Sequence, residues 1–388
     1  MVIPHLFVEW LGLSGFRWGS RALLGILFLT VALLEAEFAS ASAPSLVVYT
    51  YDSLAAPSGL GPLLRTHFEK RCQCQLKLIS CGEANQISNR LTADEAHEEA
   101  GAHIVLGVDL ASWAVLASKA EIEWRPHLPP GRPMSWSSTI AGVLSKSAGF
   151  IPFDYGVFAW MLDEKTLRER QIPVPGSLQS LLGSSYRRQL VLQDPRTSAP
   201  GLAFLLYTAA VYSEESTFKN FWDRFKTQWL TLPPSWSQAY GLFLKEEVPL
   251  VWSYTTSEAY HREKADKKGL LPSDPERNRY RALLFEEGQP LHIEGAFVVS
   301  RTLKKEEARL SPLEFRALRN RIQIFLDTLM SDEIQEAIPR TQWMFPARAG
   351  VRLPESFRQL PQPKKVVPLD YRRESLEKNL ASWRKRVQ

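Results

Sequence analysis

The sequence predicts an α/β protein with two domains, each an open sheet with flanking helices. Short runs of β-branched and apolar residues alternate with helical segments along most of the chain, which is typical of parallel βαβ units. The chain has 388 residues, a length that usually divides into two domains. Its apolar fraction of 45% is that of a globular protein. We therefore expect two lobes that face each other across a cleft.

The first 41 residues have the pattern of a secretory signal peptide. Arg17 and Arg21 precede an apolar stretch at residues 22–34, and a run of small residues follows at 39–43. About thirteen apolar residues are too few to span a bilayer comfortably. We expect export and cleavage after Ala41, because cleavage after Ala43 would leave a proline at the new N-terminus. An uncleaved membrane anchor is the alternative.

In the first half of the chain, three strands are each followed by a helix. The strands are expected at residues 46–50, 75–80 and 103–108. The first helix has Pro62 at its first position, where proline is tolerated, and the others follow residues 83–86 and Asp109. Glycine and proline punctuate the chain at residues 58–62, after the first strand. Residues 125–146, rich in proline and serine, are expected to form a surface excursion.

The second half begins with an apolar segment that is expected to cross between the domains. Pro152 and Gly156 argue against a central strand throughout residues 149–162. Further strands are expected at 189–193, 247–252 and 291–300, the last as a second crossing. Helices are expected at 202–212, 218–229, 236–245, 306–329 and 369–388, with an exposed polar stretch at 261–289. The last helix is basic and amphipathic, and we expect it to pack on a domain; a membrane-surface role is the alternative.

Charge and cysteine content limit the classes of partner. The net charge of +5 is spread along the chain and not gathered in a stripe, so no nucleic-acid partner is expected. The cysteines at 72, 74 and 81 allow one disulfide, most plausibly between Cys72 or Cys74 and Cys81. A zinc site needs four ligands, and no histidine cluster stands near them, so no metal site is expected.

Polar and aromatic residues follow the predicted strands where ligands bind in α/β proteins. Residues 253–257 carry five hydroxyl groups in a row at the end of a strand, and loops at 51–53, 83–84 and 194–198 also follow strands. Helix N-termini there suit an anion, whereas Trp and Tyr faces suit flat or cationic rings. Trp252 lies in an apolar strand and is expected in the core, and Trp236 begins a helix and is expected to be exposed.

Several motifs, in order, resemble the periplasmic thiamine-binding proteins of bacterial ABC importers. They are Tyr-Thr-Tyr-Asp-Ser at 49–53, Phe-Asp-Tyr-Gly at 153–156, Gln-Asp-Pro-Arg-Thr-Ser at 193–198, the segment 236–245, Ser-Tyr-Thr-Thr-Ser at 253–257, Ala-Ile-Pro at 337–339 and Trp-Met-Phe-Pro at 343–346. The resemblance implies a two-lobed, type II periplasmic-binding-protein-like fold. It divides the chain into a signal peptide (1–41), lobe 1 (42–152 and 291–340) and lobe 2 (153–290 and 341–388).

The resemblance also implies the ligand site. Ligand contacts are expected at Glu83, Ala84, Ser198, Trp236, Tyr254, Thr255, Thr256 and Ser257, with Tyr51, Tyr260 and Trp343 as further aromatic walls. Glu83-Ala84 stands where the family tends to have Asp-Gly. Because alanine does not adopt positive φ as cheaply as glycine, this difference bears on phosphate recognition.

The function implied is that of a periplasmic receptor that captures thiamine or its phosphate esters between two lobes. No catalytic residue, metal or cofactor is expected, thiamine being the transported ligand. The chain has no Walker loop, so the membrane permease and the ATPase are expected to be separate proteins. One alternative is a ferric-ion receptor of similar architecture, in which tyrosines and carboxylates converge on one point. The other is an exported hydrolase, although the sequence has no G-x-S-x-G elbow and no HExxH pair.

Overall fold

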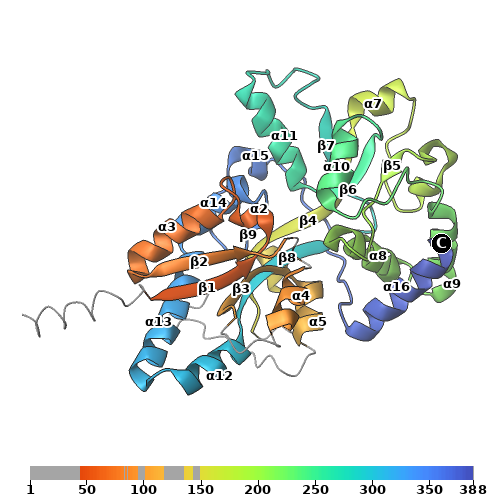
Figure 1. Cartoon of the computed structure of the whole chain (residues 1–388). Helices are drawn as coiled ribbons and strands as arrows, with labels where there is room; N and C mark the ends of the chain where they lie inside the picture. The colour runs from red at the N-terminus through yellow and green to blue at the C-terminus, as the bar shows by residue number, and fades with distance from the viewer. Residues whose placement is uncertain are drawn as a thin grey trace, which may run out of the picture. The chain divides into compact units, whose positions relative to one another are not determined.

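The computed structural model describes residues 44–82, 84, 86–94, 101–117, 135–142 and 149–387. Ser45–Gln388 forms one compact unit, shown in Figure 1. The expected signal peptide and most of the excursion at 125–146 lie outside the described residues. Within the described residues, no helix has both the length and the apolar character that crossing a membrane requires.

The strands form a single path of hydrogen-bonded neighbours in the order β2-β1-β3-β8-β4-β6-β5, with β7 and β9 paired to β4. Their bounds are β1 (Ser45–Thr50), β2 (Gln75–Ser80), β3 (Ile104–Asp109), β4 (Ile151–Asp163), β5 (Leu190–Val191), β6 (Leu250–Tyr254), β7 (Tyr280–Leu283), β8 (Leu291–Val298) and β9 (Phe345–Pro346). β1 runs parallel to β2 and β3, and β5 runs parallel to β6, as expected of βαβ units. β8 runs antiparallel to both β3 and β4, so the sheet is mixed.

The expectation that Pro152 and Gly156 exclude a central strand is wrong. β4 is a thirteen-residue strand, buried along its whole length and paired on both sides. The register of its pairing with β8 shifts between Pro152 and Asp154. A bulge of this kind leaves a residue unpaired, and proline, which has no N–H to donate, is tolerated there.

The helices lie on the faces of this sheet, which confirms the predicted α/β class. Their bounds are α2 (Asp52–Ala55), α3 (Gly61–Cys72), α4 (Gln86–Ala93), α5 (Leu110–Ala117), α6 (Ser138–Ala141), α7 (Glu164–Glu169), α8 (Ala199–Val211), α9 (Glu215–Phe225), α10 (Trp236–Leu244), α11 (Thr256–Lys267), α12 (Ser300–Arg309), α13 (Pro312–Leu329), α14 (Asp332–Thr341), α15 (Glu355–Arg358) and α16 (Arg373–Val387), with 3-10 turns at Ser180–Leu182 and Ser184–Tyr186.

The single helix predicted at 306–329 is two helices. α12 ends at Arg309, and Ser311 begins α13, because its side chain accepts from the Glu314 backbone N–H while the Glu314 carboxylate accepts from the Ser311 N–H. This capping box, followed by Pro312 at the first helical position, is a strong start signal for a helix.

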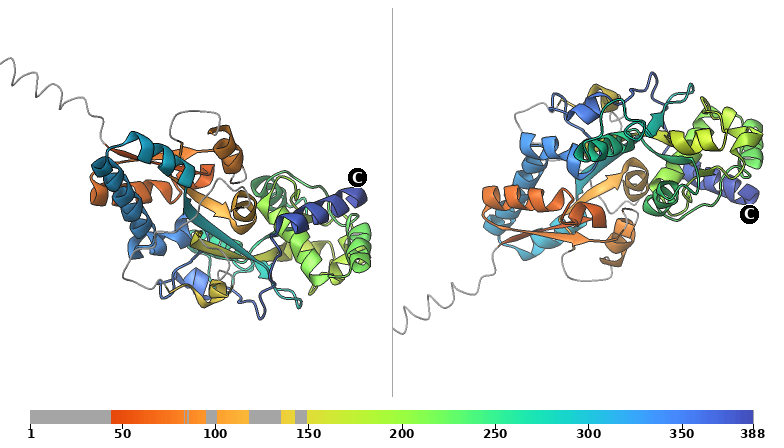
Figure 2. Two further views of the ribbon diagram at one scale, coloured as in Figure 1. Left: turned by 90° about the horizontal axis from the view of Figure 1, so that it is seen from below. Right: turned by 90° about the horizontal axis from the view of Figure 1, so that it is seen from above.

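The C-terminal helix packs on the protein as expected. In both views of Figure 2, α16 lies alongside the green helices that include α8 and α9. Trp383 is 2% exposed and belongs to a core cluster with Trp160, Phe204 and Trp222. The apolar side of α16 is therefore covered by protein.

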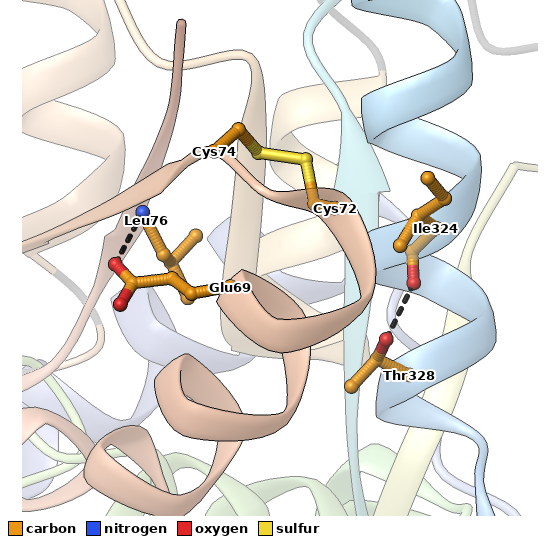
Figure 3. The surroundings of a disulfide bond; sticks show 6 residues. All are labelled: Glu69, Cys72, Cys74, Leu76, Ile324 and Thr328. Carbon is orange, nitrogen blue, oxygen red and sulfur yellow. Dashed lines mark hydrogen bonds between the residues drawn. A yellow bond between two sulfur atoms is a disulfide. The ribbon is translucent and has the colours of Figure 1, made fainter. Parts of the chain in front are cut away.

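A disulfide joins Cys72 to Cys74 at the end of α3 (Figure 3). The expected pairing with Cys81 is wrong, because β2 separates Cys74 from Cys81 and a strand extends about 3.3 Å per residue. Cys81 is a half-buried free thiol at the far end of that strand, and burial raises its pKa. Beside the disulfide, the Glu69 carboxylate accepts the Leu76 N–H at 2.8 Å and ties α3 to β2 (Figure 3).

Candidate functional site

A pocket of about 690 Å³ opens where several strands end. Its lining comes from the segments that follow β1, β2, β3, β5 and β6, from the start of β8, from α10 and from the end of α14. The lining residues on which the argument rests are Tyr51, Ala84, Asp109, Ser198, Trp236, Tyr240, Tyr254, Thr256, Ser257, Tyr260, His292, Glu294, Gln342, Trp343 and Met344.

Nine of the eleven predicted site residues line this one pocket. They are Tyr51, Ala84, Ser198, Trp236, Tyr254, Thr256, Ser257, Tyr260 and Trp343. Glu83 lies outside the described residues. Thr255 is fully buried and is not among the lining residues; its backbone N–H donates to the Val157 carbonyl at 2.9 Å. The structure brings the nine together, while their contacts with a ligand remain predictions.

The hydroxyl run orients one aromatic wall. The indole N–H of Trp236 donates to Ser253 Oγ at 2.9 Å, and Ser253 Oγ lies 2.9 Å from Ser257 Oγ. β6 ends at Tyr254 and α11 begins at Thr256, so Ser253 and Ser257 lie on either side of the strand-to-helix turn. Thr255 is the N-cap residue of α11, and its side chain makes no cap hydrogen bond.

Aromatic rings form two walls. On one side, Trp236 stacks on Tyr240 with ring centroids 4.8 Å apart, and Tyr254 lies 6.5 Å from Trp236. On the other side, Tyr260 meets Trp343 edge to face at 5.0 Å. Such rings present flat faces to a planar or cationic ligand. Trp252 lies in the core as expected, fully buried, with its indole N–H donating to the Pro200 carbonyl.

Tyr51 is held in place by two side chains and one glycine. Its hydroxyl donates to Glu294 Oε2 at 3.1 Å and accepts from Gln342 Nε2 at 2.7 Å. Its ring lies against Gly107, which has φ +92°, and a Cβ at position 107 would come within 2.6 Å of Tyr51 Cδ1. Burial, together with the charges of Glu294 and Asp154, raises the pKa of the Tyr51 hydroxyl well above its ordinary value.

Three carboxyl groups lie in a row beneath these rings. Glu294 on β8 is the direct cross-strand partner of Asp109 on β3 and of Asp154 on β4. Asp109 and Glu294 line the pocket, whereas Asp154 is completely buried. Among the described residues, neither carboxyl oxygen of Asp154 has a hydrogen-bond partner. Burial and the charge of Glu294 raise the pKa of Asp154.

His292 is the basic neighbour of this row. Its Nε2 lies 3.4 Å from Glu294 Oε1, and the imidazole is 7% exposed. Burial by itself lowers the pKa of His292, but the hydrogen bond and charge of Glu294 outweigh burial, so the pKa is raised. Within the described residues, no group of three or more His, Cys, Asp or Glu side chains has an arrangement that could hold a metal ion.

The sequence reasoning missed these acids, although a signal was present. Asp154 and Glu294 interrupt strands that are otherwise apolar. Burying a carboxylate is costly unless it is paired or put to use, so an acid inside such a strand marks a candidate site. Tyr240 and Gln342 carry no comparable signal, because helical residues of those types occur equally on ordinary surfaces and in cores.

Comparison with known proteins places the chain among bacterial receptors. A family model described as bacterial extracellular solute-binding protein matches residues 136–373. The thiamine-binding periplasmic protein of Escherichia coli K12 is 35% identical over 325 residues, which cover 82% of this chain and 86% of that protein. The protein of that name from Brucella melitensis is 33% identical over 350 residues, covering 89% and 92%.

Solved structures agree on the fold. A structure titled periplasmic thiamin binding protein superimposes with a TM-score of 0.67 and 31% sequence identity, covering 89% of this chain and 97% of that one. A ferric binding protein from Campylobacter jejuni superimposes with a TM-score of 0.63 at 14% identity, covering 88% and 98%. The second likeness, at so low an identity, concerns the fold alone.

Proposed function

Because the chain belongs to the bacterial extracellular solute-binding proteins, and within them to the thiamine-binding periplasmic proteins, we propose that it is a receptor that captures thiamine or its phosphate esters for an ABC importer. The observation that carries the proposal is the family membership, at 33–35% identity over more than four fifths of the chain. The pocket supports it, because residues chosen for their likeness to the family lie together there.

The pocket suits thiamine in size and chemistry. A volume of about 690 Å³ lies within the range of small-molecule sites, which is roughly 300–1,000 Å³. Thiamine has a flat aminopyrimidine and a cationic thiazolium ring. Each contact of the cation with a Trp or Tyr face contributes about 0.5–2 kcal/mol. The Trp236–Tyr240 and Tyr260–Trp343 pairs offer two such surfaces.

The hydroxyl or phosphate end of the ligand is proposed to lie near the N-termini of α8 and α11. Ser198, Ala199 and Pro200 at the start of α8 line the pocket, as do Thr256 and Ser257 at the start of α11. A helix N-terminus has unpaired N–H groups and a partial positive charge, both of which favour an anion. Ala84, which also lines the pocket, is proposed to contact the ligand, and Glu83 is proposed to contribute with it.

The division into two lobes, 42–152 with 291–340 and 153–290 with 341–388, is also a proposal. The two largest core clusters support this division, because each draws mainly on one proposed lobe. One contains residues of β4, β6, α8 and α9, and the other contains mainly residues of β1, β3, α3 and α13. We propose that the lobes close on the ligand and that the chain acts in the periplasm after its leader is removed. The permease and ATPase are proposed to be separate proteins, and the chain itself is proposed to have no enzymatic activity.

Calorimetric titration with thiamine, thiamine monophosphate and thiamine diphosphate tests the function. We expect tight one-to-one binding of at least one of them, with quenching of tryptophan fluorescence. Absence of binding by all three would refute the proposal. A coloured, iron-loaded preparation would favour the ferric alternative, and turnover of a phosphate ester would favour the hydrolase.

A further inference from the structure

We propose that Glu294, in a row with Asp109 and Asp154, makes this pocket selective for a ligand with a positively charged ring. The inference rests on the proposed function and adds to it the group that recognises charge. Aromatic walls hold flat rings of any charge, and hydroxyls bind neutral and anionic ends alike. A side chain that discriminates a cation from a neutral ring of the same shape has to carry negative charge.

The three carboxyl groups of the row lie side by side on one face of the sheet. Asp109, Glu294 and Asp154 are direct partners across β3, β8 and β4, and directly opposed side chains lie on one face of a sheet, about 4.5–5.5 Å apart at Cβ. Three neighbouring carboxyl groups therefore share one face. Tyr51 links the row to the pocket, because its ring lines the pocket while its hydroxyl donates to Glu294.

Asp154 is completely buried beside its cross-strand partner Glu294, and burial together with the charge of Glu294 raises its pKa. It is 0% exposed, and its two carboxyl oxygens lack hydrogen-bond partners among the described residues. It lies close enough to the pocket for its charge to act on the hydroxyls of Tyr51 and Tyr254, both of which line the pocket. A buried acid whose only charged cross-strand neighbour is another acid is destabilising until a cation approaches.

Few basic groups lie near the carboxyl groups of the row in the described part of the chain. Around the row, the described titratable groups include Tyr51, Tyr254, Tyr371 and His292. His292 forms the one ion pair with the row in the described part of the chain, at 3.4 Å from Glu294. Arg340 also lines the pocket, but its guanidinium is 65% exposed and pairs with Glu263 at 3.4 Å. One imidazole faces the two carboxyl groups of the row that line the pocket, Asp109 and Glu294, so an entering cation reduces an excess of negative charge. Burial favours the neutral form of Asp154, which therefore adds little to this excess.

The experiment compares thiamine with its neutral isostere, in which a thiophene replaces the thiazolium ring, by calorimetry at neutral pH and constant ionic strength. The proteins are the wild type, Glu294→Gln, Asp154→Asn and a control, Glu306→Gln. Glu306 is a buried acid on α12 that pairs with Arg309 and does not line the pocket. The glutamine substitutions keep the shape and remove the charge, whereas the asparagine replaces an acid whose neutral form burial favours.

We expect the wild type and Glu306→Gln to prefer thiamine about 100-fold, which is about 2.8 kcal/mol. Glu294→Gln should reduce the preference to about fivefold or less. It should weaken the binding of thiamine while leaving the affinity for the isostere within about threefold of the wild-type value. Asp154→Asn should leave the preference within about threefold of the wild type, because burial and Glu294 already favour the neutral form of Asp154.

Two outcomes overturn the inference while leaving the proposed function intact: equal binding of thiamine and isostere by the wild type, or an equal loss of both in Glu294→Gln. The wild-type comparison needs no variant, so a folding defect in Glu294→Gln does not rescue the inference. Failure of the wild type to bind either compound would instead refute the proposed function.

Discussion

Replacing Gly107 by alanine is expected to destabilise the protein in two ways, through the backbone conformation at position 107 and through a clash with the pocket residue Tyr51. Gly107 has φ +92°, which an L-residue rarely adopts, and an added Cβ would lie 2.6 Å from Tyr51 Cδ1. The positive φ costs about 1–2 kcal/mol. Forcing a methyl group into a packed site costs a further 1–3 kcal/mol or so. The free energy of unfolding should therefore fall by about 2–5 kcal/mol.

Tyr51→Ala separates the two contributions, because it removes the ring that the methyl group would meet. In that background Gly107→Ala should cost only the backbone part, about 1–2 kcal/mol, so the two substitutions should show a coupling energy of about 1–3 kcal/mol. Gly176→Ala is the control, since a Cβ there meets nothing within 4 Å, and it should change stability by no more than about 0.5 kcal/mol.

Urea unfolding of the wild type, the two single variants, the double variant and the control measures these quantities, provided that the slope of free energy against urea stays constant. Additivity within about 0.5 kcal/mol would refute the reasoning, because it would show that Gly107 and Tyr51 do not share the contact on which the position of Tyr51 depends.

Three further predictions concern binding, pH and the disulfide. Trp236→Ala should weaken thiamine binding at least tenfold, about 1.4 kcal/mol, and calorimetry showing unchanged affinity would contradict the stacking assignment. Burial lowers the pKa of His103 and His261 to about 4, so between pH 6.5 and 4 the unfolded chain binds more protons than the folded one and stability falls as pH falls. At pH 5 each histidine lowers the free energy of unfolding by about 2 kcal/mol. In the His261→Gln variant, the free energy of unfolding measured with urea should therefore decline less steeply from pH 7 to 5 than in the wild type. The Cys72–Cys74 disulfide closes a very short loop, so Cys72→Ser/Cys74→Ser should cost only about 1.6 kcal/mol by the chain-entropy relation, and a calorimetric scan showing no folded protein would contradict this.

Secondary structure that is specified by residues close together in the sequence was predicted from local sequence patterns. The strands at 46–50, 75–80 and 103–108 match β1, β2 and β3 closely, because β-branched runs bounded by polar residues specify strands locally. The strand-to-helix turn at 254–257 was predicted for the same reason, and it does lie at the pocket.

The features that were missed depend on pairing between distant segments. Pro152 is tolerated in β4 because of a register shift against β8, and no local rule predicts that shift. The row of acids exists only once β3, β8 and β4 are in register, since Asp109, Asp154 and Glu294 are far apart in sequence. The split between α12 and α13 was available locally, because Ser311-Pro312 followed by Glu314 is a helix-start signal.

The course of β4 has a mechanical consequence. Residues 151–157 pair with β8 and residues 158–162 pair with β6, and no loop interrupts the strand between these partners. Rotation of one end against the other would have to be taken up as torsion spread over several peptide units, whereas a loop would swivel freely about a single joint. Torsion in a hydrogen-bonded strand is elastic, so the strand would return to its resting twist once the load is removed. If the lobes close as proposed, the strand itself would supply the restoring torque that opens them again.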